Sequence, residues 1–188
     1  MKKLTVYPRK DLKTSETKKI RREGNIPGIL YGQGRENESI WIIGEEIQTI
    51  LRNLKSGLLG TMKFELHDGK KTHQAIIKDI QYHVANYSIL HIDFAVLEED
   101  REVTVNVPIQ ISGLAECVGV KLGGFVRQII RTMKVSCLPR NIPQEFELDI
   151  RDLDVAGSKR LSDIAIPDSI RPLARMNEVA VVIAKKSG

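Results

Sequence analysis

Two side chains capable of acid–base chemistry lie two residues apart near the middle of the sequence. His91 and Asp93 belong to the segment HIDFAVL, which alternates like a β-strand and would place both on one face. An imidazole beside a carboxylate is part of a hydrolytic triad, or simply a hydrogen-bonded pair on a solvated sheet. Because no Gly-x-Ser-x-Gly elbow supplies a nucleophile, we expect a protein that is not an enzyme.

Metal and cofactor chemistry have no recognisable motif in this chain. The spacing of its 4 histidines and 2 cysteines matches none of the common zinc-binding patterns. The glycines Gly32, Gly34 and Gly44 form neither a P-loop nor a dinucleotide-binding fingerprint. We therefore expect no metal and no cofactor.

Positive charge is concentrated at the N-terminus. Residues 1–35 contain ten Lys or Arg and three acids, so this segment sums to +7, whereas the whole chain sums to +5 and the remainder to −2. Such a segment is typical of a protein that binds a polyanion, whether a nucleic acid, a membrane surface or an acidic protein. Lys18, Arg21 and Arg22 are spaced to share one face of a helix, although cations near a helix C-terminus also favour the helix dipole.

Short elements in the N-terminal half must position these side chains. A helix is predicted to begin at Thr14 or Ser15 as its N-cap and to run to about Glu23, with Gly24 as its left-handed stop. Apolar residues at i, i+3, i+4 and i+7 predict a second helix over 45–54. Alternation predicts strands over 4–7, 29–31, 40–43, 62–66, 72–82 and 86–96, with a hairpin turn at Asp68-Gly69.

The acidic cluster Glu98, Glu99 and Asp100 interrupts this alternation and predicts a boundary between domains 1–97 and 98–188. Beyond it, alternating apolar residues around 103–107, 146–150 and 179–183 are separated by Gly and Pro turn signals. The second domain should be β-rich with little helix. The whole chain is expected to be mainly β with short helices, in the α+β class.

The chain lacks the signals of an exported or membrane-inserted protein. No apolar segment follows the basic start, and the longest apolar run, 179–184, is too short to span a bilayer. Cys117 and Cys137 could form one disulfide, but a single pair is not a secreted disulfide framework, and reduced thiols are the better interpretation. We expect a soluble cytoplasmic protein with no membrane partner.

Several stretches, taken together in order and spacing, resemble a known family. Arg9, the stretch IRREGNIPGILYG at 20–32 and HIDFAVL at 91–97 are similar to bacterial large-subunit ribosomal protein twenty-five, in its two-domain form called general stress protein CTC. In the second half, GVKLGGFV at 119–126 and CLPRNIPQEFELDI at 137–150 agree as well. The resemblance covers nearly the whole chain.

The resemblance implies a structural constituent of the large ribosomal subunit. Domain 1–97 would be a closed β-barrel bound to 5S rRNA at loop E, followed by a second β-rich domain. A-form RNA exposes 2′-hydroxyls, phosphates and base edges on its wide minor groove, which suits these side chains. By their places in the motifs, the RNA-binding residues would be Arg9, Arg21, Arg22, Tyr31, His91 and Asp93, and Lys18 joins them from the cationic helix face.

Other readings of these residues stay open at this level. Arg9 could neutralise Asp11, and Tyr31 could be a core aromatic residue. The alternative function is an off-ribosome RNA-binding stress regulator or a tRNA-binding accessory protein with the same barrel. The partner of the second domain could be a neighbouring ribosomal protein or other rRNA.

Overall fold

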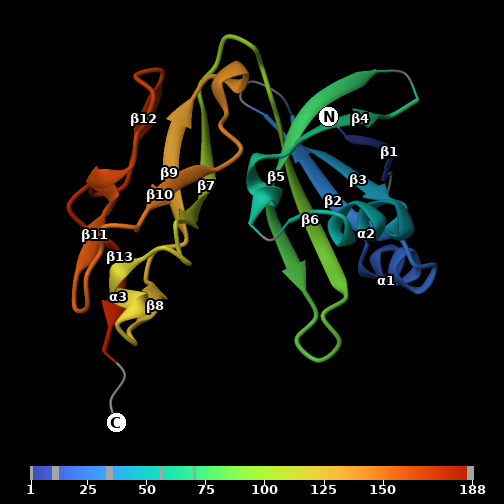
Figure 1. The fold of residues 1–188 in the computed structure, drawn as a ribbon. Helices are drawn as coiled ribbons and strands as arrows, with labels where there is room; N and C mark the ends of the chain where they lie inside the picture. Colours follow the sequence, from blue (N-terminus) through green and yellow to red (C-terminus); the bar gives the residue numbers. More distant parts are fainter. Residues whose placement is uncertain (1, 10–12, 33–35, 56, 70, 186–188) are drawn as a thin grey trace. The chain divides into compact units, whose positions relative to one another are not determined.

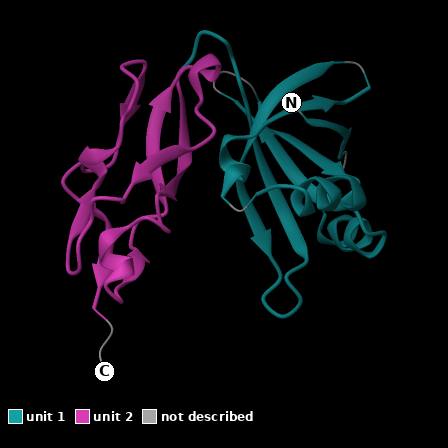
Figure 2. Ribbon diagram, viewed as in Figure 1, with its two compact units in different colours: residues 1–101 teal, residues 102–188 magenta. Residues whose placement is uncertain are grey.

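The computed structural model describes residues 2–9, 13–32, 36–55, 57–69 and 71–185 (Figure 1). The chain divides into two compact units, Met1–Arg101 and Glu102–Gly188 (Figure 2). The division falls just after the acidic cluster at 98–100, where the alternating pattern of the first half stops.

Six strands of the first unit close into a barrel in the order β1-β3-β2-β6-β5-β4, with β4 returning to β1. The β1–β4 and β2–β6 pairs are parallel, and the other pairs are antiparallel. The expectation of an N-terminal closed β-barrel is confirmed. The strands are β1 (Lys2–Pro8), β2 (Ile26–Tyr31), β3 (Glu38–Ile42), β4 (Lys63–His67), β5 (Thr72–Tyr82) and β6 (Ile89–Val96).

An apolar core fills the barrel. Phe64 of β4 and Phe94 of β6 are fully buried and meet edge to face, with ring centroids 6.2 Å apart. Ile47 of the helix α2 (Gly44–Arg52) adds to the same core. Aromatic pairs in this geometry stabilise the folded state by more than the area they bury would give. The strands that carry the surface residues therefore pack on a rigid core.

The helix α1 (Thr14–Arg22) differs from its prediction at its start. The N-cap is Lys13, without a side-chain cap, and the backbone N–H groups of Glu16 and Thr17 donate to the Lys13 carbonyl instead. Neither Thr14 nor Ser15 caps the helix. At the other end Gly24 has φ +79°, as the predicted left-handed stop requires.

Two strands begin three residues away from their predicted starts, each for a local reason, whereas the other barrel strands begin within two residues of theirs. β2 already includes Pro27, because the β2–β6 pairing starts only at Gly28 and no N–H is needed from the proline on that side. β6 starts at Ile89 because the preceding residues form the hairpin turn, closed by the His83 N–H donating to the Ser88 carbonyl.

The second unit contains a four-stranded sheet, β10-β7-β9-β12, and a three-stranded sheet, β11-β13-β8. Its one α-helix among the described residues, α3 (Val118–Lys121), is a single turn, so the prediction of a β-rich domain with little helix is confirmed. The strands are β7 (Val103–Ser112), β8 (Phe125–Gln128), β9 (Thr132–Cys137), β10 (Phe146–Asp149), β11 (Ser158–Arg160), β12 (Ile170–Pro172) and β13 (Val179–Ala184). Short 3-10 helices are η1 (Leu58–Thr61) in the first unit, and η2 (Pro139–Asn141) and η3 (Leu161–Asp163) in the second.

Both cysteines are buried in the second unit and form no disulfide. The Cys117 thiol donates to the Leu153 carbonyl at 3.3 Å. No helix in the described ranges is long and apolar enough to cross a membrane.

Candidate nucleic-acid interface

His91 and Asp93 form a hydrogen-bonded pair on β6. The His91 Nδ1 and Asp93 Oδ1 atoms are 2.7 Å apart, and the two side chains are 25% and 30% exposed. Ile92 between them is fully buried in the barrel core, so the predicted alternation is confirmed. Because Nδ1 is engaged by the carboxylate, Nε2 is the ring nitrogen left for a ligand.

The neighbouring strands extend this pair into a polar row. In the sheet register Asp93 pairs with Ile29 of β2 on one side and with Asp79 of β5 on the other, and His91 pairs with Gln81. Asp79 and Gln81 are exposed. Neither was among the residues predicted from the sequence.

Tyr31 at the end of β2 borders the same row and is half-buried. Burial first, and then the negative charges of Asp93 and Asp79, raise the pKa of the Tyr31 phenol. The hydroxyl is therefore protonated at neutral pH and available as a hydrogen-bond donor beside two carboxylates.

A bulge in β5 sets the arrangement of the acids. The β5–β6 register shifts between Ile77 and Asp79, so Lys78 is the extra residue and Asp79 lies directly opposite Asp93. Like charges opposite each other across a sheet are destabilising. Two carboxylates placed opposite each other, next to a cationic helix, are expected at a binding surface rather than at a position that only stabilises the fold.

Arg21 of α1 connects the cationic helix to this row. Its Nε and Nη2 atoms donate to the Leu90 carbonyl at 3.2 and 2.9 Å, next to His91 in the chain. Since a guanidinium has five N–H donors, the others stay available to a ligand. The side chains of Lys18 and Arg22 are exposed and make no hydrogen bond or ion pair to another residue that the structure describes.

Arg9 has a structural role at the end of β1. Its Nη2 donates to the Thr17 hydroxyl at 3.2 Å, and its backbone N–H donates to the Ser39 carbonyl at 2.8 Å. Half-buried, Arg9 thus connects α1 to the barrel. Asp11, its alternative partner in the sequence, lies outside the described residues.

The geometry places the seven predicted residues on α1, β2, β6 and the segment that follows β1, all within the first unit. Comparison with known proteins identifies that unit. Residues 4–94 match the Ribosomal L25p family, and residues 102–187 match the family described as ribosomal protein TL5, C-terminal domain. Proteins named large ribosomal subunit protein bL25 from Chlamydia muridarum and Chlamydia trachomatis serovar L2 are 43% and 42% identical to the chain over 183 residues, 97% of this chain and 99% of each relative.

The chain belongs to the bL25 family. Membership confirms the resemblance inferred from the motifs, and it assigns the chain to a family of ribosomal proteins rather than of enzymes. A relative from Chlamydia pneumoniae, with the same name, is 38% identical over the same share of the chain.

A further aromatic feature of this bL25 barrel was not singled out from the sequence. Tyr7 of β1 and Trp41 of β3 pair across the sheet and stack, with ring centroids 4.2 Å apart and an interplanar angle of 15°. Tyr7 is 37% exposed. The strand alternation could have placed the two rings on one face, but only the register shows that they meet.

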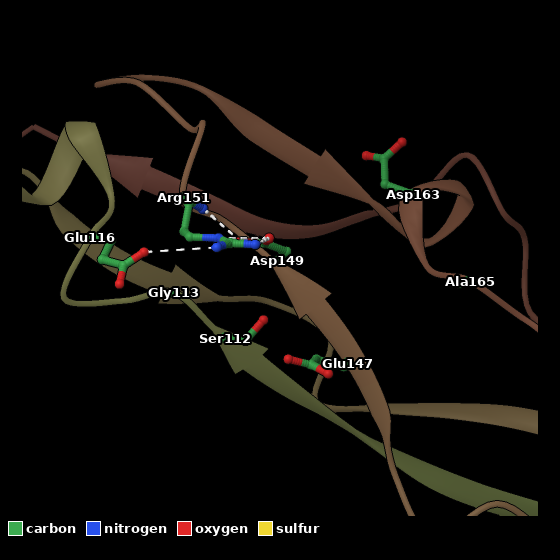
Figure 3. A pocket seen from close by; sticks show the side chains of 8 residues that line it. All are labelled: Ser112, Gly113, Glu116, Glu147, Asp149, Arg151, Asp163 and Ala165. Atoms are coloured by element: carbon green, nitrogen blue, oxygen red, sulfur yellow. Dashed lines mark hydrogen bonds and ion pairs between the residues drawn. The ribbon is translucent and has the colours of Figure 1, made fainter.

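A cavity of about 620 Å³ in the second unit is lined mainly by acidic side chains, in contrast to the cationic helix α1 of the first unit (Figure 3). Arg151 donates to both oxygens of Asp149 at 2.6–3.1 Å, and this pairing holds the pKa of Asp149 below its usual range. Because a predominantly acidic lining repels phosphates, this cavity is not itself a candidate site for RNA. It is lined by Ser112, Gly113, Glu116, Glu147, Asp149, Arg151, Asp163 and Ala165.

The pKa of Tyr31 provides a test of the polar row. Asp93→Asn should lower the pKa of Tyr31, because of the two neighbouring carboxylates Asp93 contributes more to raising that pKa, while burial keeps the value above that of a free phenol. A pH titration of the tyrosine ring carbon resonances would measure it. Asp79→Asn is the matched control and should lower the pKa less; an unchanged value in Asp93→Asn would show that the two groups do not interact.

Proposed function

We propose that the chain is a structural constituent of the large ribosomal subunit and binds 5S rRNA, in its loop E region, through the first unit. The observation that carries the proposal is that the hydrogen bonds from Arg21 to the Leu90 carbonyl attach a cationic helix to a strand that presents a row of hydrogen-bonding side chains. Family membership supports the ribosomal setting.

The two parts of the surface suit two parts of an RNA helix. Lys18, Arg22 and the remaining donors of Arg21 can contact phosphates, which supply affinity without sequence information. Tyr31, His91 and Asp93 can contact the 2′-hydroxyls and base edges of a wide, shallow minor groove. Arg9 contributes by fixing the helix that carries the cations.

The carboxylates give the surface its selectivity. A carboxylate accepts hydrogen bonds and repels phosphate, so Asp93 favours RNA that presents an amino group or a 2′-hydroxyl at its position. His91 Nε2 belongs to the same hydrogen-bonded pair and adds a second polar contact. Non-Watson–Crick pairs of the kind expected in loop E would expose such groups in the minor groove.

The first unit alone should account for the binding. Residues 1–101 should bind a loop E fragment of 5S rRNA within about tenfold of the whole chain, because every suspected contact lies there. Gel-shift titration of both proteins, against fragments with and without loop E, measures this. A larger loss on removing the second unit, or equal binding to both fragments, would contradict the proposal.

The helix cations should determine the salt dependence. Replacing Arg21 and Arg22 together by alanine should make the log–log salt slope shallower by about two, because two phosphate contacts no longer release counterions. Titrations between low and moderate salt would measure the slope.

If Arg21 and Arg22 acted only through the helix dipole, replacing them would lower the free energy of unfolding and leave the salt slope unchanged. Arg52→Ala is the matched control, since Arg52 lies in the last turn of α2 and outside the proposed surface. Arg22→Ala should alter the slope without altering the melting temperature, whereas Arg21→Ala should alter both, because only Arg21 also bonds Leu90.

A further inference from the structure

The hairpin that joins β5 and β6 ends in a tip, residues 82–90, that extends past the barrel (Figure 1). Three large side chains there are exposed: Val84 at 92%, Tyr87 at 79% and Tyr82 at 48%. Single exposed apolar residues are common on protein surfaces, but three within six residues on one projecting turn are not.

The tip is ordered by its own hydrogen bonds. The His83 N–H donates to the Ser88 carbonyl at 2.8 Å, and the Tyr87 N–H donates to the His83 carbonyl at 2.9 Å. Asn86 Oδ1 accepts from both the backbone N–H and the hydroxyl of Ser88, at 3.1 and 2.8 Å. Because the turn is already ordered, binding of a partner does not carry the entropic cost of ordering it.

Tyr87 adopts a backbone conformation that bulky residues rarely occupy. Its φ is +55°, in the left-handed region, where glycine or asparagine is normally found. A tyrosine held there, with its ring exposed, is an observed outlier of the kind that gathers at binding sites.

The charge of the tip distinguishes a protein partner from an RNA partner. Residues 82–90 contain no Asp, Glu, Lys or Arg, although 28% of the chain is charged. The turn between β4 and β5, by contrast, carries Asp68 and Lys71. RNA binding draws on cations, whereas the centres of protein interfaces are depleted of charge and enriched in tyrosine.

We propose that the tip 82–90 is a protein-docking element whose partner is a protein of the large subunit that presents an uncharged, apolar pocket. Val84 and Tyr87 are its anchors. This inference rests on family membership and on the tip, and it does not depend on 5S rRNA binding by the polar row.

The first test measures binding of the full chain to large subunits that lack it. Val84→Ser with Tyr87→Asn should weaken binding at least about tenfold, as expected when two anchors of an interface are removed. Asparagine tolerates the left-handed region, so the turn should keep its shape and the melting temperature should not change. Val84→Ser alone is a second variant that leaves position 87 intact and should show part of the loss.

Lys71→Ser, at the other turn, is the matched control and should bind like the unaltered chain. The second test places a benzophenone side chain at position 84 of the full chain and irradiates the assembled subunit. The crosslink should be removed by protease and resist ribonuclease. A crosslink to RNA, or unchanged binding of the double variant, would overturn the proposal.

Discussion

Asp93→Asn should weaken binding of loop E by about 1–3 kcal/mol while binding to an unrelated RNA duplex stays unchanged or becomes tighter. Asp93 accepts a hydrogen bond from His91 and borders the protonated Tyr31. Asparagine keeps the size of the side chain but loses the charge and half of its acceptor capacity. An RNA group that donates to Asp93, or that contacts an oriented His91, would lose its partner.

Bulk electrostatics predicts the opposite sign. If Asp93 only repelled phosphates, its replacement by asparagine would tighten binding to every RNA. The variant should fold, because Asp93 is part of the exposed side of β6 while its neighbours Ile92 and Phe94 are fully buried. The measured sign therefore separates the two mechanisms without interference from stability.

Asp79→Asn is the control that the structure supplies. Asp79 lies opposite Asp93 in the sheet but makes no hydrogen bond to His91. Its replacement should leave loop E binding unchanged or tighter, since it removes only a negative charge. If both variants bind loop E more tightly, or if Asp93→Asn loses affinity equally for both RNAs, Asp93 has no selective role.

Local pattern was enough to predict the parts of this surface that depend on one element. His91 and Asp93 share a face because side chains alternate along a strand, and Lys18, Arg21 and Arg22 share α1 because of helical spacing. The barrel itself was expected only from the resemblance, since its closure depends on the β1–β4 and β2–β6 pairs between segments far apart in the sequence.

Features that depend on register were missed for the same physical reason. Periodicity gives the face of Asp79 within β5 but not its partner, and the bulge at Lys78 changes that partner by one residue. The hydrogen bond from Arg21 to the Leu90 carbonyl spans 69 positions and has a backbone acceptor, so the residue types alone do not predict it. The expected N-cap was wrong because the Lys13 carbonyl already accepts the first backbone hydrogen bonds of α1, and no side chain caps the helix. The Arg9 side chain, which donates to the Thr17 hydroxyl, also contacts this first turn.

Gly28→Ala should reduce both stability and RNA binding, because Gly28 of β2 pairs with Ile92, the residue between His91 and Asp93. A Cβ atom at position 28 would lie 2.7 Å from the Ile92 carbonyl oxygen. No such contact is tolerated, and the obstacle is backbone rather than a flexible side chain. The β2–β6 pair must therefore separate locally.

Overpacking of this kind costs about 1–3 kcal/mol of the free energy of unfolding. The melting temperature of the first unit should fall by roughly 4–8 °C for each kcal/mol. Thermal unfolding followed by circular dichroism measures this loss.

Gly69→Ala separates displacement of the site from general loss of stability. Gly69 lies in the turn between β4 and β5 at φ +84°, and a Cβ atom added there would have no described neighbour within 4 Å, so alanine strains the backbone without a clash. That strain costs about 1–2 kcal/mol, similar to the loss expected at position 28. Well below both melting temperatures, Gly69→Ala should bind loop E normally, whereas Gly28→Ala should bind it more weakly because His91 and Asp93 move with Ile92. Equal binding by the two variants would mean that the position of β6 against β2 does not determine the geometry of the polar row.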